Sequence, residues 1–238
     1  PRIDSNDNKP NPNLTVLAWL NHQPGFEGKV AAFGAWDVIS AVVNPERCDC
    51  VTNSAYEPLN MTPTTPRLGL LNAIKAETPR MWEDEAFDTV TFHTTMEYIR
   101  AKRPRVLFLS LGDTDEWAHA GNYGEYLESA HRSDAYLKQI WDEVQSMPEY
   151  RGNTTMIFLT DHGRGDAPEG WKTHGQKTPE SKYIFMGFMG QGVPAMGVRT
   201  KVPAVTQSQV AATLAEYLGL DWNAVEKKAG KPVAAALK

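Results

Sequence analysis

RVLFLSLGDTDEWAHAG, residues 105–121, joins a short apolar run to a polar segment rich in Asp. Its first seven residues form a short, continuous apolar run, which is typical of a strand covered on both faces. The polar residues that follow directly can turn into a helix. Because open α/β sheets carry their functional residues just beyond the carboxyl ends of the strands, this junction predicts a site as well as a strand.

Three other runs share this character, and each is continuous rather than alternating, as expected of buried strands. They are KVAAFGAW at 29–36, TTMIFLT at 154–160 and KYIFMGFM at 182–189. Helical patterns lie between them, and the clearest is 123–147, where apolar residues recur at three- and four-residue steps. Weaker ones are 14–20 with Asn13 as a cap, 83–102, and 206–218 with Thr206 and Gln209 at capping-box spacing. This alternation predicts an α/β fold, with a mostly parallel sheet flanked by helices on both faces.

The composition excludes some classes of partner. Lys and Arg number 24 against 29 Asp and Glu, which gives a formal charge of −5 and argues against binding to a nucleic-acid polymer. Hydrophobic residues make up 41% of the chain, as in ordinary globular proteins. No apolar run approaches the roughly 20 residues of a membrane span. We therefore expect a folded protein without a membrane span.

Residues 1–238 are expected to form a single α/β domain. Within it, residues 44–66 are rich in Pro, Asn and Thr, and we expect a loop or a lid over the surface. Cys48 and Cys50 are separated by one residue, a spacing that disfavours an unstrained disulfide between them. The first residues contain neither an initiator Met nor an apolar signal core, so we expect the chain to begin inside a longer protein.

Five Asp and His residues lie at or after the ends of predicted strands. Asp115 and His119 stand four apart, which places both on one face of a helix, although this spacing alone is more often a surface ion pair. Asp161 and His162 follow the strand at 154–160, and His174 lies in the next loop. Imidazole and carboxylate donors in this combination suit zinc and also admit manganese or iron. The pattern predicts a metal site at the carboxyl edge of the sheet.

Three motifs in this order, DTDEWAH, LTDHGRG and WKTHG, resemble the alkaline phosphatase superfamily, in particular its type I phosphodiesterase and nucleotide pyrophosphatase branch. The resemblance extends over roughly residues 106–220 and implies an alkaline-phosphatase-like fold whose N-terminal part is missing here. It implies that Asp115, His119 and His174 bind one divalent metal ion and that Asp161 and His162 bind a second, about 4 Å away. Zinc is the first expectation for both ions.

The resemblance also implies an activity, the metal-dependent hydrolysis of a small phosphodiester or phosphomonoester by in-line displacement between two metal ions. The family's nucleophile, a Thr or Ser at a helix start, and the Asp after its first strand have no counterpart that we recognise here. We therefore name no catalytic residue in this chain and expect it to hydrolyse esters poorly. Relatives with such a metal set often act outside the cytoplasm, which favours a periplasmic or secreted location.

Other functions stay open from the sequence. A sulfatase of the same superfamily would need a modified Cys or Ser nucleophile and an oxygen-rich calcium site, which three histidines do not favour. A phosphosugar mutase would need a large inserted cap. The chain could also be a non-catalytic metal-binding or recognition module derived from a phosphatase, with residues 44–66 as its binding surface. In a purely structural interpretation, the five Asp and His residues serve as helix caps and ion pairs.

Overall fold

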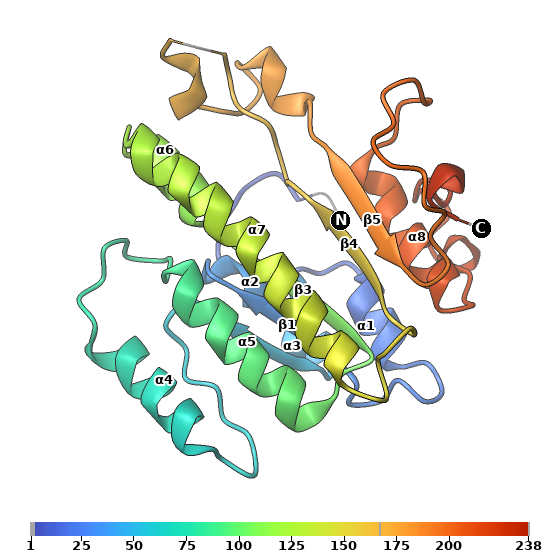
Figure 1. Cartoon of the computed structure of the whole chain (residues 1–238), viewed down its shortest axis with the longest axis horizontal. Helices are drawn as coiled ribbons and strands as arrows, with labels where there is room; N and C mark the ends of the chain where they lie inside the picture. The colour runs from blue at the N-terminus through green and yellow to red at the C-terminus, as the bar shows by residue number, and fades with distance from the viewer. Residues whose placement is uncertain (1–2, 167, 238) are drawn as a thin grey trace. The chain divides into compact units, whose positions relative to one another are not determined.

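The computed structural model describes residues 3–166 and 168–237 and divides the chain into two compact units. Unit 1 consists of Pro1–Trp117 and Asn122–Tyr136, and unit 2 consists of Ala118–Gly121 and Leu137–Lys238. Figure 1 labels the α-helices and most of the strands. The single domain expected for residues 1–238 stays a prediction.

Unit 1 is built on a three-stranded parallel sheet with the strand order β2-β1-β3. β1 is Val30–Gly34, β2 is Val51–Ser54 and β3 is Val106–Ser110. Phe33 lies opposite Asn53 on one side and Leu109 on the other. All five residues of the central strand β1 are buried, as its continuous apolar sequence predicts.

Helices cover both faces of this sheet. On one face, Phe33 packs against Tyr98 of α5 (Asp88–Lys102), with ring centroids 5.1 Å apart, and against Leu68 of α4 (Pro66–Glu77). Gly34 points to the other face because side chains alternate along a strand, and there a Cβ would lie 2.5 Å from Ile39 of α2 (Val38–Val43). The parallel sheet and its flanking helices confirm the predicted α/β fold class.

The first helix, α1, is Val16–Asn21 and begins later than the sequence suggested. The expected cap, Asn13, instead donates its backbone and side-chain N–H groups to Asn11. Thr15 is the N-cap, and its hydroxyl accepts a hydrogen bond from the N–H of Ala18 at 3.1 Å. The helix therefore starts where a hydroxyl can satisfy one of its free N–H groups.

The expectation that residues 44–66 form a loop was wrong for the first half of that segment. It contains α3 (Pro45–Cys48) and then β2, which pairs with β1 at the edge of the sheet. Asn44 caps α3, since its side chain accepts a hydrogen bond from the N–H of Arg47. The sequence VTNS has one apolar residue, so its polarity hid a short edge strand.

The expectation about the two cysteines was also wrong, because Cys48 and Cys50 form a disulfide. Asp49 between them adopts a left-handed conformation with φ of 50°, which turns the chain sharply. The two Cα atoms are consequently 5.0 Å apart, within the range that a disulfide spans.

Unit 2 contains a two-stranded antiparallel sheet of β4 (Thr155–Leu159) and β5 (Met186–Gly190), in which Ile157 lies opposite Phe188. Both strands were predicted, but their residues are half-buried rather than covered on both faces, and their pairing is antiparallel. β5 begins four residues later than expected because Pro179–Lys182 forms a 3₁₀ helix, η2. The two apolar runs are therefore strands of their own small sheet.

The helices at 123–147 and 206–218 are present close to their predicted bounds, and the segment with Asp115 and His119 is helical. α6 is Asp113–His119 and α7 is Tyr123–Ser146, while Gln207–Gln209 forms η3 and leads into α8 (Val210–Tyr217). The capping box of Thr206 and Gln209 is present in both directions. Three further 3₁₀ turns are η1 (Gly170–Lys172), η4 (Trp222–Ala224) and η5 (Ala234–Ala236). Among the described residues, none of the helices combines the length and apolarity that crossing a membrane requires.

Candidate metal centre

The turn after β4 carries Asp161 and His162 and is tightly packed. The N–H of His162 donates to the carboxylate of Asp161 at 2.9 Å, and the N–H of Gly163 donates to the carbonyl of Ser181 at 2.7 Å. A Cβ on Gly163 would lie only 2.4 Å from the carbonyl oxygen of Tyr183. Glycine is therefore required here, because the backbone of the 181–183 segment lies directly against the turn.

The loop with His174 is tied to the same segment. Gly175 has φ of 108°, and its N–H donates to the hydroxyl of Ser181 at 3.0 Å. The carbonyl and the hydroxyl of Ser181 thus bind the backbones beside His162 and His174, respectively. Ser181 is buried, and the sequence carries no motif that marks it.

Three imidazoles of unit 2 lie in direct contact. The rings of His162 and His174 are stacked, with centroids 3.7 Å apart and an angle of 11° between their planes. Nε2 of His174 also lies 3.0 Å from Nε2 of His119. His174 therefore contacts both of the other histidines, although His119 and His174 are 55 residues apart in the chain.

The nitrogen positions suit a transition metal. Two nitrogens bound to zinc at tetrahedral angles are about 3.3 Å apart, because each lies 2.0–2.1 Å from the ion. The separation of Nε2 in His119 and His174 is close to this value at 3.0 Å. Nδ1 of His162 lies 3.0 Å from the carbonyl oxygen of Gly163, so a proton on Nδ1 leaves Nε2 as a donor atom for a metal.

The two aspartates of the predicted site differ in their surroundings. Asp161 is exposed, and its carboxylate oxygen Oδ2 lies 3.5 Å from Nε2 of His162. Asp115 lies on α6, one turn before His119, so the two side chains share a helix face as expected. The structure thus brings His119, Asp161, His162 and His174 together and places Asp115 next to His119 along the helix.

Two buried acidic residues of unit 1 near the start of α6 belong to no motif of the sequence. Asp88 is 2% exposed and accepts the N–H of Gly112, and Glu85 is 6% exposed. Burial, followed by the negative charge of Glu116 and nearby aspartates, raises the pKa of Glu85 to about 9. Burial and the adjacent Asp113 raise the pKa of Asp88. Nothing in their sequence spacing signals these contacts, since Asp88 and Asp113 are 25 residues apart.

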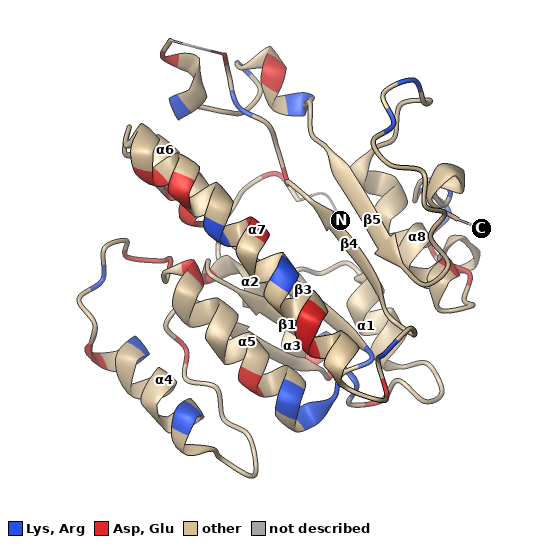
Figure 2. Ribbon diagram, viewed as in Figure 1, with Lys and Arg blue, Asp and Glu red and all other residues tan. Residues whose placement is uncertain are grey.

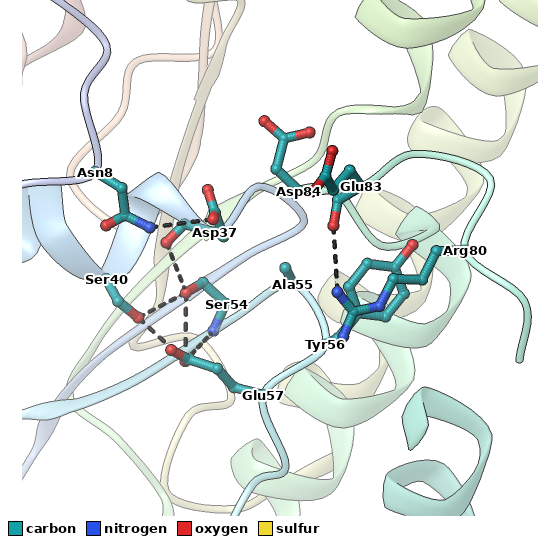
Figure 3. A pocket seen from close by; sticks show the side chains of 10 residues that line it. All are labelled: Asn8, Asp37, Ser40, Ser54, Ala55, Tyr56, Glu57, Arg80, Glu83 and Asp84. Atoms are coloured by element: carbon teal, nitrogen blue, oxygen red, sulfur yellow. Dashed lines mark hydrogen bonds between the residues drawn. The ribbon is translucent and has the colours of Figure 1, made fainter. Parts of the chain in front are cut away.

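A cavity of about 380 Å³ lies in unit 1, where β1 and β2 end (Figure 3). Its charged lining residues are Asp37, Glu57, Glu83, Asp84 and Arg80. The carboxylates are engaged by neighbours: Asp84 accepts the indole N–H of Trp36 at 3.1 Å, and Glu57 accepts the N–H of Ser54 at 3.0 Å. The guanidinium of Arg80 lies over the ring of Tyr56 at 4.3 Å. Ser54, Tyr56 and Glu57 belong to the segment 44–66, and no motif marks the other lining residues.

The basic residues of the described chain are distributed over many elements (Figure 2).

Comparison with known families gives one match. The sequence model of the type I phosphodiesterase / nucleotide pyrophosphatase family matches residues 12–234 and so includes the five predicted metal ligands. Searches among curated proteins and among solved structures found no match. Because the family model extends over most of the chain, the protein belongs to the type I phosphodiesterase / nucleotide pyrophosphatase family of phosphate-ester hydrolases, within the alkaline phosphatase superfamily.

Proposed function

We propose that the protein hydrolyses phosphodiesters or phosphomonoesters with the help of divalent metal ions bound at the histidine cluster of unit 2. The observation that carries this proposal is the position of His174, whose Nε2 is 3.0 Å from that of His119 and whose ring stacks on His162. The three imidazoles come from segments that are separated in sequence, and their contact places several ring nitrogens close together. A transition metal would use those nitrogens as donors.

The family supports a division of the ligands between two ions. Asp115, His119 and His174 are proposed to hold the first, and Asp161 and His162 the second. Membership in a typically metal-dependent family supports this division, as does the helical spacing of Asp115 and His119. Zinc suits this donor set best, while manganese or iron could replace it.

The ions would supply the positive charge that phosphoryl transfer needs at the attacking and departing oxygens. The residues of this chain orient that charge. The hydrogen bond between Nδ1 of His162 and the carbonyl of Gly163 fixes the ring and leaves Nε2 as the nitrogen that can bind a metal. Ser181 holds the loops of His162 and His174 at a fixed separation. We assign none of these residues as the nucleophile and expect slow turnover by this chain.

The test is to measure zinc affinity and stoichiometry for the purified protein and for His174→Ala, with His131→Ala as the matched control. His131 is an exposed residue of α7 that lies outside the predicted ligand set. We expect tight binding of one to two zinc ions by the wild type and by the control. His174→Ala should lose it, because it removes the ring that contacts both other histidines.

A second assay separates the enzymatic proposal from a non-catalytic metal-binding module. It measures the hydrolysis of an aryl phosphodiester and of an aryl phosphomonoester, each with and without added zinc. Zinc-dependent turnover of either ester that His174→Ala abolishes supports the hydrolase. Tight zinc binding without any turnover of either ester would favour the non-catalytic module. Zinc affinity that does not change in His174→Ala would exclude the proposed centre.

A further inference from the structure

We propose that Asp88 is a positioning residue for the metal centre, because its carboxylate fixes the start of α6, the helix that carries Asp115 and His119. The inference rests on the proposed function and adds to it a residue outside every motif of the sequence analysis. Asp88 would not touch the metal or the substrate. It would act through the backbone of the segment that leads into α6.

The contact consists of three hydrogen bonds between the start of α5 and the start of α6. The carboxylate of Asp88 accepts the N–H of Gly112 at 2.7 Å and the N–H of Asp113 at 3.2 Å. In return, the carboxylate of Asp113 accepts the N–H of Asp88 at 2.9 Å. We call these three residues, Asp88, Gly112 and Asp113, the α5–α6 clasp. Each helix thereby satisfies free N–H groups of the other.

The clasp is connected to the proposed ligand by a single residue. The N–H of Gly112 donates to Asp88, and the carbonyl of Gly112 accepts the N–H of Asp115 at 2.8 Å. A displacement of Gly112 would therefore move the first turn of α6 and, with it, the carboxylate of Asp115. Metal affinity is sensitive to such shifts, because ligand distances and angles must be held closely.

Glu85 restricts the same glycine from another side. A Cβ built on Gly112 would lie 1.7 Å from Oε1 of Glu85, so the carboxyl fills the space that a side chain would need. This oxygen is buried and makes no hydrogen bond in the part of the chain that the structure describes. Gly112 is thus held by the hydrogen bond that its N–H donates to Asp88 and by close packing against Glu85.

The clasp is a costly way to join two helices. Asp88 and Asp113 are each 2% exposed. The guanidinium of Arg132 forms an ion pair with the Asp113 carboxylate, but the distance between them is long at 3.9 Å. Two buried carboxylates beside each other lower stability relative to apolar packing. Such a cost is understandable where the groups fix the geometry of a functional site, which is the role we assign to Asp88.

The experiment compares zinc affinity in the wild type, Asp88→Asn and Asp142→Asn, together with their stability in urea and the visible spectrum of bound Co²⁺. Asn has one acceptor oxygen where Asp88 has two, so one N–H at the start of α6 loses its partner. We expect Asp88→Asn to bind zinc roughly ten- to a hundredfold more weakly, as is usual when a group that supports a ligand is removed. Its Co²⁺ spectrum should shift. Asp142→Asn is the matched control, because Asp142 is an exposed residue of α7 paired with Lys138, and it should change neither the zinc affinity nor the Co²⁺ spectrum.

A second variant, Gly112→Ala, disturbs the clasp without altering its carboxylates and should also weaken zinc binding and shift the Co²⁺ spectrum. If Asp88 has a purely structural role, the variants should be less stable in urea but should keep the zinc affinity and the Co²⁺ spectrum of the wild type. That result in both Asp88→Asn and Gly112→Ala would overturn the inference. If the wild type binds zinc while both variants match it, the inference alone fails. If the wild type binds no zinc, the proposed centre fails and the inference with it.

Discussion

Replacing Glu85 by Gln should change how stability depends on pH. The carboxyl of Glu85 is buried against Gly112, and its pKa is raised from 4.5 to about 9. The native state therefore keeps this proton between these two pH values, whereas the unfolded chain releases it. The contribution of this group to the free energy of unfolding is fully present below pH 4.5 and is lost progressively as the pH rises from 4.5 through about 9. Gln has the same shape and carries no ionisable proton, so it removes this dependence.

The size of the effect follows from the shift. Each pH unit within the window lowers the free energy of unfolding of the wild type by up to about 1.4 kcal/mol relative to Glu85→Gln. Between pH 6 and pH 8 the difference between the two proteins should thus change by up to about 2.7 kcal/mol, in favour of the variant at the higher pH. Local relaxation and water entry would reduce this value, so it is an upper bound.

Urea denaturation at pH 6, 7 and 8 in the presence of EDTA measures the difference directly, and the chelator keeps bound metal from contributing. Glu128→Gln, an exposed position on α7, serves as the control for loss of a carboxyl at the surface. Parallel stability profiles of wild type and Glu85→Gln across this range would show that the Glu85 carboxyl is ionised in the folded protein, and the reasoning would then be wrong.

Three further changes test other parts of the structure. Phe33→Ala removes a fully buried ring of the central strand and should lower the free energy of unfolding by about 3–5 kcal/mol in urea; a loss below 1 kcal/mol would contradict its place in the core. Gly163→Ala should weaken zinc binding, because its Cβ would collide with the carbonyl of Tyr183, and equal affinity in a competition assay would show that the turn adapts. Thiol titration of the denatured protein should find no free thiol before reduction and two after it, since Cys48 and Cys50 are joined; free thiols before reduction would rule out the disulfide.

The strands of the fold could be predicted where the sequence is continuously apolar. The runs at 29–36, 105–111 and 154–160 each enclose the observed strand to within two residues, because continuous hydrophobicity marks a strand whatever its partners are. β1 is buried throughout as expected, whereas β3, in which Phe108 is 41% exposed, and the half-buried β4 are less covered than the sequence predicts. β2 was missed because its residues are mostly polar and it forms the edge of the sheet. Its identity as a strand depends on pairing with β1, which no local pattern of Val51–Ser54 reveals.

The candidate site divides in the same way. The grouping of His119, His162 and His174 could be expected because each residue belongs to a motif beside a strand end or loop glycine. Asp88 and Ser181 could not, because their hydrogen bonds are to backbone groups that are distant in sequence: Asp88 accepts the N–H of Gly112, 24 residues later. Ligands carry a chemical signature in their side chains, whereas the residues that support them are recognised only by their contacts.

The strand order β2-β1-β3 also bears on the sequence of events in folding. β1 pairs with β2 across about 20 residues and with β3 across about 75, so closing the second chain loop costs about 1.2 kcal/mol more in entropy. The β1–β2 pair can therefore form early, together with α2, which lies between the two strands in the chain. β3 can pair with β1 only later, because α4 and α5 precede it and must be ordered first. Pulsed hydrogen exchange should find the amides between β1 and β2 protected before those between β1 and β3, and the reverse order would contradict this sequence. Since α6 starts directly beyond β3, the helix that carries Asp115 would be among the later parts of unit 1 to reach its final position.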